Sequence, residues 1–309
     1  MTAKIPTPPD RFEIKVRGPI DPARSLAIFS RWGDDLLDRW DGHTLLRTLP
    51  IDGRNVAFAI TFAGTARAPI LSVTVEHASA AEIVEHAVAR TFVNPPREFA
   101  ALGRADPIVG RLDARYRGLR TVLQSNLLSA LVRCISAQQV NLKWAALTRR
   151  RLAEHFGDSH SVAGETVTSL DANRLANATV AEIRALQFTN RKSEYIIAVA
   201  REMADDRLDL ESLIAMSDDA VIERLVAIRG IGRWTAEWIL ARTMGRPRVV
   251  AGDLGVRKAV GIAYGGGAMP SEDDTRRLTA HWGGSSGHAQ TMLLHALGEK
   301  ELHQLARPD

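Results

Sequence analysis

Cysteine is almost absent from this sequence of 309 residues, which contains only Cys134. A single thiol excludes an intramolecular disulfide and any zinc or iron–sulfur site built from four cysteines. It also fits a reducing compartment, where disulfides are rare. Because Cys134 lies in the apolar run Leu127–Ile135, we expect it to be a buried, small hydrophobic residue.

Long hydrophobic runs are absent as well. No segment has the roughly 20 apolar residues that a membrane helix needs, and the N-terminal MTAKIPTPPD lacks the apolar stretch of a signal peptide. We therefore expect a cytoplasmic protein with no membrane partner. The net charge of +4 permits a nucleic-acid partner without requiring one, because a polyanion responds to a local basic patch and not to the total.

The first 95 residues have the pattern of a small α+β domain. Asp21 and Pro22 form a helix start, and we expect that helix to run to about Arg39, with a second helix at about Ser79–Phe92. Four short runs with alternating apolar residues predict an antiparallel sheet: Phe12–Val16, Thr44–Leu49, Val56–Phe62 and Ile70–Val75.

Strand signals almost vanish in residues 96–309, and we expect this region to be helical, so that the fold is mainly α. Thr179 with Glu182 and Ser271 with Asp274 have the spacing of helix caps. Helical periodicity marks Leu127–Ile135, Asn141–His155, Arg191–Ala204, Asp218–Ala227, Trp234–Met244, Leu254–Ala263, Asp273–Trp282 and Ala289–Leu297.

A Gly-x-Gly turn joins two of these helices within residues 218–244. Gly230 and Gly232 allow a sharp bend and a close approach by another molecule, and Ile231 between them can anchor the turn. Free N–H groups at the start of the second helix suit a phosphate oxygen, and Arg229 and Arg233 flank the turn without a competing acidic cluster. A plain helix–helix turn with a glycine cap explains the same residues.

Three landmarks give the chain a resemblance to the helix-hairpin-helix DNA glycosylase superfamily, and within it to the DNA-3-methyladenine glycosylase II branch. They are 135–140 (ISAQQV), 230–236 (GIGRWTA) and 249–255 (VVAGDLG), in the family's order. The α+β N-terminal domain fits that branch too, so the resemblance covers nearly the whole chain. It implies a helical glycosylase core, double-stranded DNA with a damaged base as partner, a monomer associated with a bacterial nucleoid, and DNA contacts from Gly230, Gly232, Arg233 and Thr235.

Asp253 precedes a helix, about twenty residues after the hairpin, and on its own it is explained as an N-cap aspartate. By resemblance it is the catalytic residue, and the two roles are compatible because a capping aspartate is held rigid. Cleavage of an N-glycosidic bond leaves positive character on the deoxyribose, which a fixed carboxylate stabilises. The sequence leaves open whether Asp253 acts by electrostatics or as a general base for water.

The resemblance implies hydrolysis without strand cleavage. Bifunctional relatives use a lysine of the second hairpin helix as a Schiff-base nucleophile, and Trp234 occupies that position here. We expect Lys192 and Lys258 to be solvated surface charges. The expected product is an abasic site formed by release of an alkylated purine such as 3-methyladenine in base excision repair.

The base pocket and the wedge are also assigned by resemblance. Trp234 and Trp238 share a helix face at i, i+4 and line the base pocket, although core packing explains them equally well. Gln139, after Gln138, fills the gap left by the flipped nucleotide, where two polar loop residues are the simpler interpretation.

The chain departs from the family near its C-terminus, where the stretch Thr291–Leu297 lacks the usual further aromatic residue and follows an unusual glycine-rich run, Gly283–Gly287. The lesion spectrum therefore stays open. Two alternatives remain: a glycosylase for oxidised or deaminated bases, and a non-catalytic protein that uses the hairpin as a DNA clamp. We expect no cofactor and no side-chain metal site, while relatives hold a monovalent cation at the hairpin carbonyls.

Overall fold

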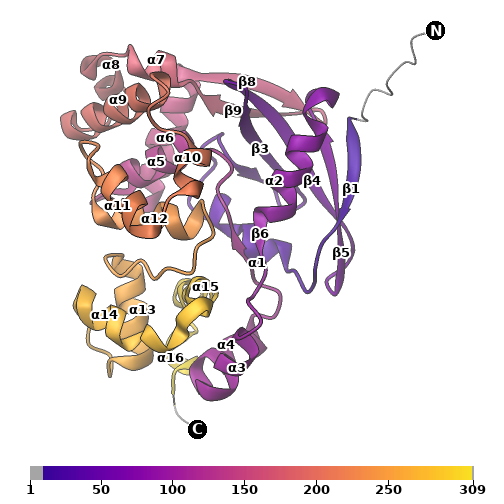
Figure 1. Cartoon of the computed structure of the whole chain (residues 1–309), viewed down its shortest axis with the longest axis vertical. Coiled ribbons are helices and arrows are strands. Elements are labelled where there is room, and N and C mark those ends of the chain that lie inside the picture. The colour runs from indigo at the N-terminus through magenta and orange to yellow at the C-terminus, as the bar shows by residue number, and fades with distance from the viewer. Residues whose placement is uncertain (1–9, 308–309) are drawn as a thin grey trace.

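An antiparallel sheet of five strands forms the N-terminal part of the protein in a computed structural model, which describes residues 10–307 (Figure 1). The segment behind the signal-peptide expectation lies outside these residues, apart from Asp10. The strand order β1-β5-β4-β3-β2 confirms the predicted antiparallel sheet, and Asp52-Gly53 forms the tight turn between β3 and β4. The strands are β1 (Arg11–Lys15), β2 (Arg39–Trp40), β3 (Thr44–Ile51), β4 (Arg54–Thr65) and β5 (Ala68–Val75).

Two predicted helices accompany the sheet, and one of them is much shorter than expected. Asp21 caps α1 (Pro22–Leu26), but the helix ends there and only the short 3-10 turn η1 (Ala27–Phe29) follows. The prediction of a helix to Arg39 is wrong because Asp34 and Asp35 accept hydrogen bonds from backbone N–H groups two residues later, which favours a turn over a helix. The second helix is confirmed as η2 (Ala78–Ala80) followed by α2 (Ala81–Thr91).

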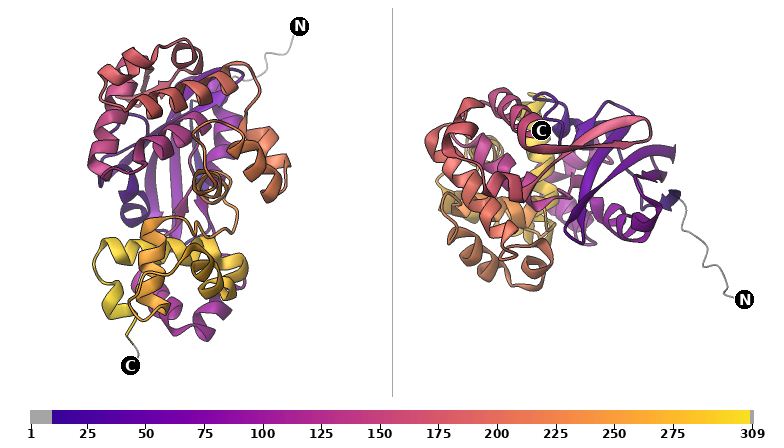
Figure 2. Two further views of the ribbon diagram at one scale, coloured as in Figure 1. Left: turned by 90° about the vertical axis from the view of Figure 1, so that its left-hand side faces the viewer. Right: turned by 90° about the horizontal axis from the view of Figure 1, so that it is seen from above.

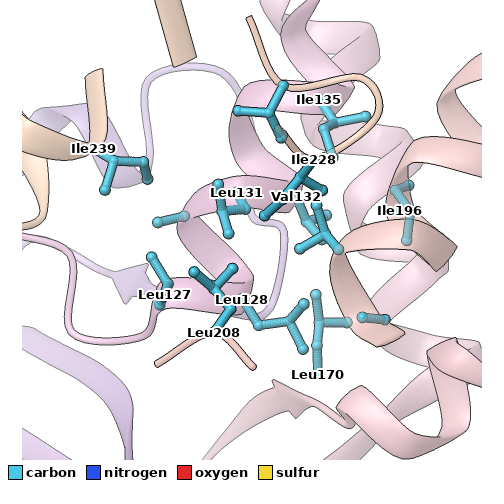
Figure 3. Packing of buried hydrophobic residues seen from close by; sticks show 14 of the residues in the cluster. Leu127, Leu128, Leu131, Val132, Ile135, Leu170, Ile196, Leu208, Ile228 and Ile239 are labelled. Atoms are coloured by element: carbon cyan, nitrogen blue, oxygen red, sulfur yellow. The ribbon is translucent and has the colours of Figure 1, made fainter. Parts of the chain in front are cut away.

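The helices after residue 96 pack around two separate hydrophobic cores, which appear as an upper and a lower lobe (Figures 1 and 2). The upper lobe, whose leucine- and isoleucine-rich core is shown in Figure 3, contains α5 (Leu127–Ala137), α6 (Leu142–Phe156), α7 (Ala172–Ala176), α8 (Val180–Ala185), α9 (Asn190–Ala204), α10 (Leu210–Ala215), α11 (Asp218–Val226) and α12 (Arg233–Arg242). The lower lobe contains α3 (Phe99–Ala105), α4 (Pro107–Arg115), α13 (Leu254–Tyr264), α14 (Glu272–Leu278), η3 (Ala280–Ser285), α15 (Ser286–Gly298) and α16 (Leu302–Leu305).

Both predicted caps are present. Thr179 and Glu182 form a capping box at α8, and Ser271 accepts the N–H of Asp274 at α14. Cys134 is buried, as expected, and burial raises the pKa of its thiol. Within the described residues, no helix has the length and apolar character needed to cross a membrane.

A hairpin of β8 (Gly157–Val162) and β9 (Glu165–Leu170) corrects the expectation that strand signals vanish after residue 96. Its strands are mostly polar, and its two-residue turn, Ala163-Gly164, lacks the Asn or Asp that usually marks such a turn. Val162 and Val167 pack against the sheet residues Leu46, Ala57 and Ala59, so the hairpin extends from the upper lobe onto the sheet (Figure 1). A short antiparallel pair of strands, β6 (Phe92–Val93) and β7 (Thr121–Val122), joins the end of the N-terminal part to the segment that precedes α5.

A buried ionic network joins the loop after η1 to the upper lobe. Asp35 lies 2.8 Å from Arg149 Nε and 2.9 Å from Arg133 Nη1, and Asp38 pairs with Arg133 at 3.0 Å and with Arg47 of β3 at 2.7 Å. Burial by itself would raise the pKa of Asp35, but the guanidinium groups of Arg133 and Arg149 hold this pKa below its usual value. The network therefore fixes the sheet against α5 and α6.

We predict that Asp35→Ala destabilises the protein by about 3–5 kcal/mol, because two buried guanidinium groups lose their carboxylate. Urea unfolding measures the change. The control is Asp158→Ala, which breaks the exposed pair with Arg174 and should cost less than about 1 kcal/mol.

The same carboxylate predicts a pH dependence of stability. Because the pKa of Asp35 is lower in the folded state, its contribution is complete above the unfolded value of about 3.9 and is lost as the pH falls towards the folded value. Equal acid sensitivity of wild type and Asp35→Asn between pH 2 and 5 would contradict this account.

Candidate functional site

A cleft of about 1350 Å³ is formed by residues from the N-terminal part and from both helical lobes. The predicted site residues Gln138, Gln139, Trp234 and Asp253 all line it, together with Gly252. Six basic side chains line the cleft, against one acidic side chain, that of Asp253: Arg24, Arg31, Arg120, Arg191, Lys192 and Arg242. Such a lining attracts anions and leaves a single negative charge inside the cleft.

Asp253 is held by two neutral donors. Its Oδ1 accepts the N–H of Val256 at 2.9 Å, so that it caps α13 as predicted, and its Oδ2 accepts the indole N–H of Trp234 at 3.1 Å. The indole contact comes from the hairpin's second helix, α12. The carboxylate is thus fixed by two elements that are distant in sequence, on the cleft wall beside Gly252 and Gly255.

The Gly-x-Gly turn joins α11 to α12 and presents free backbone donors. Gly232 is the N-cap residue of α12 and has no side chain to satisfy the helix N-terminus. The first backbone hydrogen bond of the helix runs from Ala236 N–H to the Gly232 carbonyl at 3.1 Å. The N–H groups at the start of α12 therefore lack intrahelical acceptors, as at any helix start. Ile231 is buried in the upper core and anchors the turn, as expected.

The two glycines of the turn are needed for different reasons. Gly230 has φ +92°, and a Cβ there would lie 2.0 Å from the ring of Tyr195. Gly232 has an ordinary φ of −98°, and a Cβ there would meet no atom within 4 Å. The protein's own packing thus requires Gly230, whereas Gly232 leaves open space in front of the helix N-terminus.

The arginines that flank the turn have acidic partners, which corrects the expectation of no competing acid. Arg229 pairs with Glu194 at 2.7 Å, and Arg233 contacts Glu237 at 3.1 Å. Glu237 is itself buried and also receives Arg248 and Arg276, so that three arginines share one carboxylate. Arg248 also contacts Asp218, and Arg276 also contacts Glu272 and Asp273, so that charges of both signs lie on this side of α12.

Trp238 and Thr235 lie differently from what the resemblance implied. Trp238, one helical turn after Trp234, is not among the residues that line the cleft, and its partly buried side chain packs against the upper core. Thr235 is also buried, so its side chain does not reach the surface, and only its backbone N–H belongs to the helix start.

Of the two lysines that we expected at the surface, one is exposed and one is buried. Lys258 is exposed, as expected, but Lys192 is buried, lines the cleft and donates from Nζ to the Ser136 carbonyl at 2.8 Å. Burial lowers the pKa of Lys192. The periodic pattern of α9 could not reveal this placement, because it depends on the end of α5.

The Gln138–Gln139 loop follows α5 and contacts the hairpin. Gln138 Nε2 donates to the Gly230 carbonyl at 3.2 Å, and Gln139 is exposed with a φ of +53°, which is rare for a residue with a side chain. The structure therefore brings the predicted wedge loop next to the turn, and Gln139 projects at the cleft.

Sequence reasoning missed two cleft residues that carry distinct chemistry. Trp32, in the loop after η1, is 40% exposed and lines the cleft, and Arg242, at the end of α12, is half-buried and lines it as well. From Thr291–Leu297, the residues Thr291, Leu294, His295 and Leu297 line the cleft without an aromatic ring other than the imidazole of His295. Trp32 and Tyr195 supply aromatic rings to the lining from other elements.

We predict that Gly230→Ala destabilises the protein by about 2–5 kcal/mol, from the left-handed backbone and the clash with Tyr195. Gly232→Ala should change stability by no more than about 1 kcal/mol. Thermal or urea unfolding of the two variants tests this, and equal effects would contradict the different roles of the two glycines.

Comparison with known proteins agrees with this geometry. The chain is 31% identical over 186 residues to the DNA-3-methyladenine glycosylase of Bacillus subtilis, a match that covers 60% of this chain and 61% of that protein. The match thus spans about three fifths of the relative's length.

Two solved structures share the fold. The 3-methyladenine DNA glycosylase of Archaeoglobus fulgidus has a TM-score of 0.82 at 23% identity, covering 92% of this chain and 97% of that one. The 8-oxoguanine glycosylase/lyase of Clostridium acetobutylicum in complex with double-stranded DNA has a TM-score of 0.69 at 15% identity, covering 94% and 98%. Residues 132–284 match the HhH-GPD superfamily of base excision DNA repair proteins. This range includes the hairpin and Asp253. The chain therefore contains an HhH-GPD domain, which spans just under half of its length.

Proposed function

We propose that this protein is a monofunctional DNA glycosylase that hydrolyses the N-glycosidic bond of a damaged, flipped-out base in base excision repair. The observation that carries the proposal is the position of Asp253 in the basic cleft, beside the hairpin and fixed by Val256 and Trp234. The similarity in sequence and fold to DNA-3-methyladenine glycosylases favours alkylated purines as substrates.

The hairpin supports a DNA partner. Open space over Gly232 and free N–H groups at the start of α12 suit a phosphate oxygen, which is bound without reading the base sequence. Trp234 connects this surface to Asp253 through its indole N–H. A phosphate gripped at the turn would therefore place the neighbouring sugar near the carboxylate.

The chemistry follows from this placement. As the bond between C1′ and the base nitrogen breaks, positive charge develops on the sugar, and the carboxylate of Asp253 stabilises it. Water adds to C1′ and loses a proton to Asp253 or to solvent. An alkylated purine is cationic and leaves with the bonding electrons without needing a strong general acid.

The remaining expectations form part of the same proposal: double-stranded DNA with a damaged base as partner, a monomer, and a cytoplasmic, nucleoid-associated location. A monovalent cation at the turn also remains a proposal. The carbonyls of Ile228 and Gly230 each accept one hydrogen bond and keep a second lone pair.

We predict that Asp253→Asn lowers base release by at least about 100-fold while DNA binding changes little, because the loss of negative charge affects the transition state more than the ground state. Single-turnover release of 3-methyladenine and binding to an abasic-site analogue give the two measurements. Release near the wild-type rate would refute the assignment and favour a DNA clamp.

Borohydride trapping tests whether the enzyme lacks lyase activity. We predict no covalent protein–DNA adduct, because Lys192 Nζ is engaged with the Ser136 carbonyl and Trp234 occupies the position of the family's lysine. Lys192→Met is the decisive comparison. An adduct in the wild type that disappears in this variant would identify Lys192 as a Schiff-base nucleophile and overturn the proposal of hydrolysis alone.

A further inference from the structure

Arg242 is a half-buried cation that lines the cleft. Its Nη1 donates to Thr291 Oγ1 at 3.0 Å, and within residues 10–307 no acidic side chain forms an ion pair with it. In contrast, the buried residues Arg47, Arg133 and Arg149 pair with Asp35 or Asp38. Burial lowers the pKa of Arg242 to about 10, with an opposing attraction from Asp253, so that the side chain stays charged at neutral pH.

Thr291 fixes the direction of this guanidinium. Its Oγ1 lies 2.7 Å from Thr121 Oγ1 and donates to the Gly287 carbonyl at 2.8 Å, which anchors the hydroxyl on α15. A guanidinium has five N–H donors, and only the bond to Thr291 uses one of them here. The other donors have no acceptor among the described residues, and because the side chain lines the cleft, a bound ligand can supply one.

The depth of the site limits which part of DNA can supply that acceptor. Phosphates are expected at the hairpin turn, whereas Arg242 lies inside the cleft and within electrostatic reach of Asp253. Arg120 is a buried cleft residue that likewise lacks a carboxylate partner, but its neighbouring acid is Asp113 and its Nε is bonded to the Pro19 carbonyl. Of the two, Arg242 is therefore the one placed to meet a base held beside Asp253.

We propose, on the basis of the proposed function, that Arg242 is a specificity-determining residue that donates hydrogen bonds to the 6-oxo group of the extruded purine. Guanine and hypoxanthine have an acceptor at this position, whereas adenine has an amino group that donates. The contact favours release of guanine- and hypoxanthine-derived lesions over adenine-derived lesions.

The contact also affects the leaving group. When the bond between C1′ and N9 breaks, the electron pair moves onto the purine, and water adds to C1′ and loses a proton. A cationic base leaves as a neutral purine, whereas a neutral base leaves as an anion and then takes a proton from solvent. For a neutral base such as hypoxanthine, negative charge develops on the ring and on O6, where the guanidinium stabilises it. For a cationic base, the same guanidinium contributes only the hydrogen bond and a repulsion.

Single-turnover release of three lesions tests the proposal. 7-Methylguanine and 3-methyladenine are both cationic, so that their rate ratio cancels charge effects and isolates the contact at position 6; hypoxanthine adds the neutral case. In Arg242→Met, we expect the ratio of 7-methylguanine to 3-methyladenine release to fall on the order of 10-fold, and hypoxanthine release to fall at least as much.

Two further variants keep the test specific. Arg120→Met removes a second cleft arginine and should change the ratio by less than about twofold. Thr291→Val keeps the charge but removes the oxygen that orients Arg242, and it should shift the ratio in the same direction as Arg242→Met; Thr291→Ser should restore it. Thermal unfolding of each variant establishes that it is folded.

An unchanged ratio in folded Arg242→Met, or in Thr291→Val if Arg242→Met does not fold, would overturn the proposal even if all rates fell together. Failure of the proposed function has a different signature. In that case, the wild-type protein would release none of the three bases, and both proposals would be refuted.

Discussion

The buried contacts of Asp35 and Asp38 set the geometry on which the cleft depends. These carboxylates lie in the loop between η1 and β2 and are held by arginines of α5, α6 and β3. Because the same loop carries Trp32 into the cleft, the network fixes the N-terminal wall of the cleft relative to the helices. A buried ion pair adds little to stability compared with apolar packing, but it tolerates few alternative arrangements once both charges are desolvated.

The network continues from this wall to the loop beside the hairpin. Arg149, which pairs with Asp35, also donates to Ser136 Oγ at 2.9 Å, and Lys192 binds the Ser136 carbonyl. Two buried cations thus hold the end of α5, from which Gln138 reaches the Gly230 carbonyl. The strained backbone at Gln139 persists because its neighbours on both sides are fixed.

Local sequence signals were sufficient to predict a feature where the residues of one structural element determine it. The alternating strands, the caps at Thr179 and Ser271, the Gly-x-Gly turn and the cap at Asp253 all depend on residues within one turn of each other. The polar β8–β9 hairpin could not be predicted, because sheet residues distant in sequence stabilise it. The early end of α1 was missed although the turns formed by Asp34 and Asp35 are local. The burial of Lys192, the position of Trp238 outside the cleft and the unpaired Arg242 likewise depend on how α9, α12 and α15 pack.

The way Asp253 is held suits the catalytic role that we propose for it. Six basic residues line the same cleft, yet the side-chain and backbone donors that fix Asp253 are the neutral N–H groups of Trp234 and Val256. A guanidinium bound to the carboxylate would already neutralise it and would compete with the sugar. Neutral donors orient the group and leave its charge available, while Arg242 interacts with it through space and without an ion pair between them. The cleft thus combines attraction for a polyanion with one negative charge at the point where the proposed reaction forms positive charge.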